Sequence, residues 1–139
     1  MKLVTVIRWP KLTAVVPVKP VPVWQMIGEA GETSREVRLR VEKAVTRQRR
    51  RFRCQPYCWN SRIPAGGIPA YCRLTEECSN SLMEAVKKLT LSSRACHSIL
   101  KVARTVADLA GSEEICREHV LEAVQHRRFG EEDPFWSYA

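Results

Sequence analysis

Apolar residues recur every three or four positions in the part of the chain after residue 30, and this period predicts helices. The first such run predicts an amphipathic helix of about five turns. Thr33 and Glu36 at its start match a capping box, in which a hydroxyl and a carboxylate satisfy the first backbone N–H groups. Its inward face is expected to consist of Val37, Val41, Ala44, Val45, Gln48 and Phe52.

Three further helices are expected, over residues 75–88, 94–110 and 117–128. Ser92 or Ser93 caps the middle one, and Gly111 offers it a left-handed C-terminal cap. Apolar residues go almost all round this helix, so we expect it to be the buried centre of the fold. Prolines and glycines in the connector at 54–74 allow only one short turn there, around residues 68–72.

Residues 1–30 follow a different pattern. Pro10, Pro17, Pro20 and Pro22 separate short Val-rich stretches. Proline cannot donate to a strand ladder, so this segment is expected to be extended. The predicted organisation is therefore an extended Pro/Val-rich segment at 1–30 and, at 31–139, an all-α domain built as a four-helix bundle.

Composition argues against one kind of enzyme. The chain of 139 residues has only two aspartates, Asp108 and Asp133, neither of which precedes a glutamate, and none of its six glycines precedes a lysine. Motor ATPases use an Asp-Glu pair to hold Mg²⁺ and a loop ending in Gly-Lys-Ser/Thr to hold the phosphates. We therefore expect that this chain does not hydrolyse ATP by itself.

Location and cysteine chemistry are also constrained. No stretch approaches the roughly 20 apolar residues of a membrane span, and Arg8, Pro10 and Lys11 interrupt the first apolar run, so a signal peptide is not expected. We expect a cytoplasmic protein with reduced cysteines and no membrane contact. The spacings of Cys54 from Cys58 and of Cys72 from Cys78 fit a zinc site poorly, which favours core packing instead.

Three stretches carry a resemblance to a known family. They are residues 31–45, residues 91–112 with their Leu-Ser-Ser-Arg start, and residues 118–127. Smaller matches occur at Cys58-x-Asn60, at Tyr71-Cys72-x-Leu74 and at the aromatic end formed by Phe135 and Trp136. Together they resemble the C-terminal lid domain of magnesium chelatase-like AAA+ ATPases of the bacterial competence (ComM) type.

The resemblance implies a helical lid that covers the nucleotide of a larger, ring-forming ATPase concerned with DNA processing. It identifies Arg94 as the sensor arginine that reaches the γ-phosphate, with Ser93, Arg104 and Asp108 on the same helix in support. ATP and Mg²⁺ are implied for the intact parent only, and no cofactor is expected on this chain alone. The implied partner is an AAA+ α/β domain, in cis or in a neighbouring subunit. The resemblance also offers residues 1–30 as a remnant of that α/β domain.

Two charged features leave alternatives open. Arg104 and Asp108 are four residues apart, so they form either a simple intrahelical ion pair, worth about 0.2–0.5 kcal/mol, or a partly buried pair that fixes the lid. Nine Lys or Arg between residues 35 and 53 form either a solvated helix face or a contact with DNA or another subunit. No aromatic interleaving on this basic face supports base stacking. The candidate contact residues are Arg47, Arg49, Arg50 and Arg51.

Three hypotheses of function follow. The first is a non-catalytic lid fragment that contributes Arg94 to a nucleotide held elsewhere. The second is a free-standing basic helical module that binds DNA. The third is a non-functional remnant of a truncated or frame-shifted gene.

Overall fold

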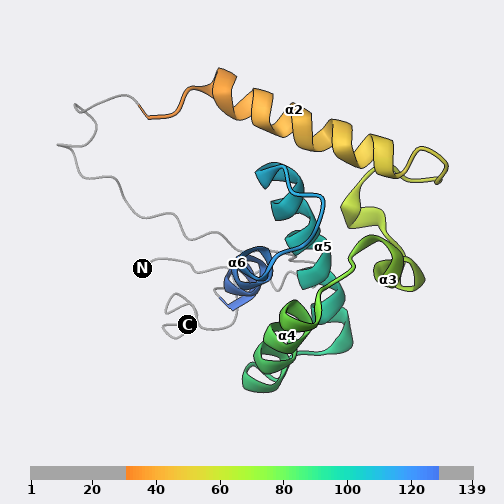
Figure 1. Ribbon diagram of the computed structural model, residues 1–139, viewed down its shortest axis with the longest axis vertical. Coiled ribbons are helices and arrows are strands. Elements are labelled where there is room, and N and C mark those ends of the chain that lie inside the picture. Colours follow the sequence, from red (N-terminus) through yellow and green to blue (C-terminus); the bar gives the residue numbers. More distant parts are fainter. Residues whose placement is uncertain (1–30, 129–139) are drawn as a thin grey trace, which may run out of the picture.

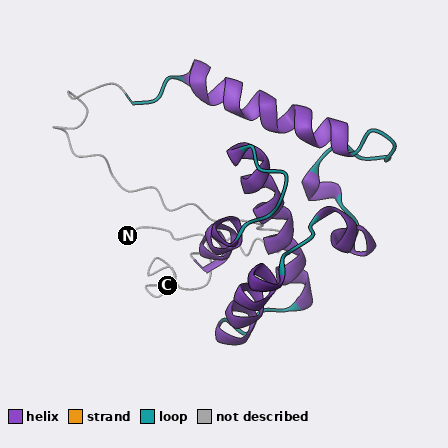
Figure 2. Cartoon of the chain, viewed as in Figure 1, coloured by secondary structure: helices purple, strands orange, loops and turns teal. Residues whose placement is uncertain are grey.

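The structure is a computed structural model that describes residues 31–128. The extended segment expected at 1–30 and the acidic and aromatic tail after residue 128 lie outside the described residues. Within 31–128 the chain is mostly helical and contains no strand, as Figure 2 shows, which confirms the all-α character of this part. The elements are α2 (Ser34–Arg51), η1 (Asn60–Arg62), η2 (Ala65–Gly67), α3 (Ile68–Tyr71), α4 (Glu76–Lys88), α5 (Ser93–Ala110) and α6 (Arg117–Arg128).

The helix ends follow local signals in the sequence. Thr33 and Glu36 form the expected capping box at the start of α2, and the Thr75 hydroxyl accepts from the Cys78 N–H at the start of α4. Ser92, the first of the two candidates, caps α5 by accepting from the Ala95 N–H. Gly111 ends α5 with φ of 82°, a left-handed conformation that residues with a Cβ adopt only under strain.

Helix α5 is the central element, as its nearly continuous apolar surface predicts. It packs against α2, η1, α3 and α6, and α6 packs in turn against α4 (Figure 1). A parallel bridge between Leu74 and Ile115 joins the segment before α4 to the loop before α6. The buried core cluster consists of Phe52, Ile63, Ile68, Cys72, Cys78, Leu82, Ile99, Ala103, Ala107, Ile115, Val120 and Ala123.

The N-terminal half of α2 departs from the expected bundle. Ala44, Gln48 and Phe52 are buried as predicted, but every residue from 31 to 43 is exposed. Val37 and Val41, expected on the inward face, are 37% and 45% exposed, so that part of the prediction is wrong for the described chain. Only the C-terminal half of α2 contributes buried side chains, and a regular four-helix bundle is not confirmed.

Candidate functional site on helix α5

Arg94 lies in the first turn of α5, two residues after the Ser92 cap. Its side chain is exposed, and it makes no hydrogen bond or ion pair with any other residue in the range 31–128. A positive charge at a helix N-terminus opposes the helix dipole, so Arg94 does not stabilise the helix where it lies. Ser93 is the first residue of α5 and is exposed, and the capping role belongs to Ser92. The guanidinium of Arg94 is therefore free to meet a group outside the described chain.

Arg104 and Asp108 lie toward the other end of the same helix. Ten residues separate Arg94 from Arg104, which corresponds to about 15 Å along an α-helix. Asp108 is completely buried, and Arg104 is 3% exposed. The Nη2 atom of Arg104 lies 3.1 Å from Oδ1 of Asp108. The candidate residues on α5 thus form two groups, an exposed cation at the start and a buried ion pair near the end.

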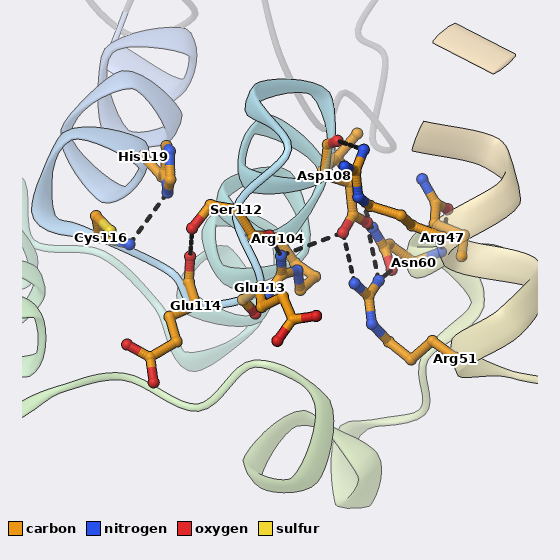
Figure 3. A network of polar contacts seen from close by, with 12 residues as sticks. Arg47, Arg51, Asn60, Arg104, Asp108, Ser112, Glu113, Glu114, Cys116 and His119 are labelled. Atoms are coloured by element: carbon orange, nitrogen blue, oxygen red, sulfur yellow. Dashed lines mark hydrogen bonds and ion pairs between the residues drawn. The ribbon is translucent and has the colours of Figure 1, made fainter. Parts of the chain in front are cut away.

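The Asp108 carboxylate joins α2 and the connector to α5 (Figure 3). Arg51 of α2 donates to both of its oxygens, with 2.8 Å from Nη1 to Oδ2. Asn60 at the start of η1 donates from Nδ2 to Oδ2 at 2.8 Å and accepts from Arg51 at 3.1 Å. The backbone N–H of Asn60 is in turn bound by Oε1 of the buried Gln48 at 3.0 Å. One carboxylate on α5 therefore holds the end of α2 and the start of η1, both of which are distant from it in sequence.

Arg104 fixes the loop between α5 and α6. It donates from Nη1 to the Glu113 carbonyl and from Nη2 to the Ser112 carbonyl, both at 2.7 Å. The loop then enters α6 through His119, whose Nδ1 accepts from the Cys116 N–H at 3.0 Å (Figure 3). A simple intrahelical ion pair does not describe Arg104 and Asp108, because both residues are buried and both bind other segments. Of the two alternatives, Arg104 and Asp108 therefore form the buried pair.

Charge and burial act against each other at this cluster. Burial raises the pKa of Asp108, but hydrogen bonds from Arg51 and Asn60 and the charges of Arg51 and Arg104 outweigh it, so the pKa lies below its usual range. Burial lowers the pKa of Arg104 and the charge of Asp108 opposes that effect. An arginine nevertheless stays charged in proteins. The ion pair is therefore intact at neutral pH.

The lowered pKa predicts acid sensitivity. We expect the Asp108 carboxyl to titrate below the reference value of about 3.9 for an unfolded chain. Its contribution to stability is then complete above that value and is lost as the pH falls through the folded-state pKa. Because the chain has only two aspartates, an Asp133→Asn variant leaves one aspartate signal for a carbon-13 NMR titration. A midpoint at or above about 3.9 would contradict the prediction.

The basic side chains of α2 are divided between two environments. Arg47 donates to the Asp108 carbonyl at 3.2 Å and Arg51 binds the Asp108 carboxylate, and both are half-buried. Arg49 and Arg50 are exposed. Arg47 and Arg51 therefore also bind inside the chain. A contact with DNA or a subunit stays a prediction for all four.

An open cavity of about 350 Å³ lies beside the cluster, between the end of α3 and the loop before α6. Arg51, Arg73 and Arg104 line it together with Glu113 and Glu114. Asp108, which is paired with Arg51 and Arg104 of this lining, adds a further negative charge next to the cavity. Three positive and three negative groups balance, so the cavity has no charge preference that would identify a ligand.

The cysteines do not gather into a metal site in the described part. Residues 31–128 hold no group of three His, Cys, Asp or Glu side chains placed to bind a metal ion. Cys72 and Cys78 are buried in the core, and burial raises the pKa of the Cys72 thiol to about 11. Cys54, Cys58 and Cys116 are exposed.

None of the helices in residues 31–128 is long and apolar enough to cross a bilayer.

Sequence comparison places these features in a family. Residues 31–127 match the family model described as magnesium chelatase, subunit ChlI C-terminal. The chain is 38% identical over 125 residues to the competence protein ComM of Haemophilus influenzae, and 35% identical over 116 residues to the uncharacterized protein YifB of Salmonella typhimurium. YifB of Escherichia coli is also 35% identical over 116 residues.

Each alignment covers 84% of this chain and 22% of the relative, so the chain spans about a fifth of the length of the curated relatives that it matches. The resemblance carried by residues 31–45, 91–112 and 118–127 is thereby confirmed. The chain belongs to the family of the C-terminal domain of magnesium chelatase subunit ChlI.

Proposed function

We propose that residues 31–139 act as the helical lid of a magnesium chelatase-like AAA+ ATPase and that Arg94 contacts the γ-phosphate of ATP. The nucleotide and its Mg²⁺ are held by an α/β domain, in cis or in a neighbouring subunit of a ring. The chain itself is not catalytic. Its parent is a cytoplasmic protein that takes part in DNA processing during competence.

The observation that carries this proposal is the exposed guanidinium of Arg94, which has no partner within residues 31–128, at the start of an otherwise anchored helix. A guanidinium can form two charge-assisted hydrogen bonds to phosphate oxygens, each worth about 1.5–3 kcal/mol in favourable settings. Precise placement requires a rigid support, because loosely held groups lose much of their effect. The buried cluster around Asp108 provides that support by locking α5 to α2, the connector and the loop before α6.

The exposed N-terminal half of α2 supports the idea of a partner domain. Val37, Leu39 and Val41 are 37%, 50% and 45% exposed on this half of α2, where all described residues are exposed. Val37 and Val41 are four residues apart and so share one face of the helix, and exposed apolar side chains grouped in this way commonly mark an interface. In the proposed assembly the α/β domain covers it and completes the lid as a four-helix arrangement. Membership of the chelatase family does not favour the alternatives of a free-standing DNA-binding module or a gene remnant.

The proposal is tested with a chimera in which residues 31–139 replace the C-terminal domain of H. influenzae ComM. We expect the chimera to hydrolyse ATP and the ComM protein without its C-terminal domain not to do so. The isolated 139-residue chain, titrated with Mg-ATP, is expected to show no binding tighter than about 1 mM, which corresponds to only about 4 kcal/mol. Micromolar Mg-ATP binding by the isolated chain would show that the nucleotide site has been assigned to the wrong domain.

A further inference from the structure

The segment between Lys43 and Thr75 carries charge of one sign only. It contains eight Lys or Arg and no Asp or Glu. Asp108 binds two of these cations, Arg47 and Arg51, inside the chain. The remaining six are exposed, and none forms an ion pair with another residue of the described part. They are Lys43, Arg49, Arg50, Arg53, Arg62 and Arg73.

An indole ring lies beside one of these cations. Trp59 immediately precedes η1 and is 42% exposed, and the Arg49 guanidinium carbon lies 5.8 Å from the centre of its ring. This distance is within the range of a cation–π contact. The basic run itself offers no aromatic residue for base stacking, but the fold brings Trp59 from outside the run to its edge. The connector returns to α2 and places Trp59 beside Arg49, which the spacing along the chain could not show.

The backbone that carries the ring is held in place by its surroundings. The Arg62 N–H donates to the Trp59 carbonyl at 3.0 Å, and this bond closes the turn of η1. Lys101 of α5 donates from Nζ to the Ser61 carbonyl at 3.2 Å and so ties the same turn to the central helix. Asn60, the next residue, is fixed by Gln48 and Asp108. We name the set Arg49, Arg50, Arg53, Trp59 and Arg62 the Trp59 platform.

We infer that the Trp59 platform binds single-stranded nucleic acid, with one base stacked on the Trp59 ring and neighbouring phosphates on the arginines. Single-strand binders combine exposed aromatic rings with basic side chains, and here an exposed ring lies beside Arg49 in a segment whose charges are all positive. Arg49 orients the ring and adds a cation–π contribution. A duplex keeps its base faces stacked inside, so it can use the arginines but not the ring. This surface is independent of Arg94 and needs no ATP.

The experiment measures binding of a fluorescent oligothymidylate of about 12 nucleotides to the 139-residue chain by anisotropy, at several salt concentrations. Trp59→Ala is expected to weaken binding by roughly 5- to 150-fold, the effect of one lost stacking contact. Trp59→Phe should keep most of the affinity, because a phenyl ring also stacks. The log–log salt slope should be unchanged in Trp59→Ala, whereas Arg50→Ala should reduce it by about 0.7 for a single lost phosphate contact.

The matched control is Arg38→Ala, which removes one exposed charge from α2 about 18 Å along the helix from Arg50 and should leave binding nearly unchanged. An oligouridylate of equal length distinguishes RNA from DNA as the source of the shared base and phosphate chemistry. Circular dichroism establishes that each variant is folded. The inference is overturned if Trp59→Ala binds as tightly as the parent chain, if a duplex of equal length binds as well as the single strand, or if polyglutamate competes equally, which would indicate an acidic protein partner.

Discussion

Replacing Asp108 with alanine is expected to destabilise the folded chain by about 3–5 kcal/mol, because it leaves the buried Arg104 without its counter-ion. The Asp108 side chain is completely buried and Arg51 loses its partner as well. A loss of this size is a large part of the 5–15 kcal/mol that stabilises a typical domain. Urea unfolding followed by circular dichroism measures it. Glu84→Ala, which removes an exposed carboxylate from α4, is the matched control and is expected to change stability by no more than about 0.5 kcal/mol.

A double-mutant cycle separates the ion pair from the general cost of altering the core. Asp108→Ala combined with Arg104→Ala removes both charges, so the double variant should be less destabilised than the sum of the single variants by about 0.5–3 kcal/mol. Strict additivity would show that the two side chains act separately. A single-variant loss below about 1 kcal/mol would mean that water reaches the site and solvates Arg104, which the observed burial does not allow.

The helices of this chain could be predicted from the sequence because their signals are local. Thr33, Thr75 and Ser92 are hydroxyl caps within three residues of the N–H groups that they accept from, and Gly111 supplies the left-handed end of α5. The central place of α5 follows from its own apolar surface. Such features depend on a few neighbouring residues, and periodicity and capping chemistry describe them directly.

The contacts around Asp108 could not be predicted in this way. Its partners Arg51 and Asn60 are 57 and 48 residues away in the sequence, and nothing local distinguishes Arg51 from the neighbouring Arg50. One signal was present, since Gln48 is a polar residue on the apolar face of α2, and a buried amide needs a polar partner. The exposure of Val37 and Val41 could not be predicted for another reason. Periodicity shows that a helix has an apolar face but not what covers it.

For Arg94, the proposed lid function predicts a loss of activity without a loss of stability. In the ComM chimera, Arg94→Ala is expected to lower kcat for ATP hydrolysis by about 10³-fold, the lower end of the effect of an arginine placed on a transferring phosphoryl group. KM for ATP should change much less, because the interaction strengthens as charge develops on the phosphate. Arg94→Lys should recover only part of the rate, since an ammonium keeps the charge but not the two-pronged geometry.

The effect on stability distinguishes Arg94→Ala from Asp108→Ala. Arg94 is exposed and its charge opposes the dipole of α5, so Arg94→Ala should leave the unfolding midpoint of the chain unchanged or slightly raised. Arg117→Ala, in the first turn of α6, removes another exposed arginine and should affect neither rate nor stability appreciably. A chimera with Arg94→Ala that hydrolyses ATP within a few-fold of the parent rate would remove the chemical role of Arg94. The helix would then keep its structural role, because the bonds of Arg104 and Asp108 do not involve its N-terminal turn.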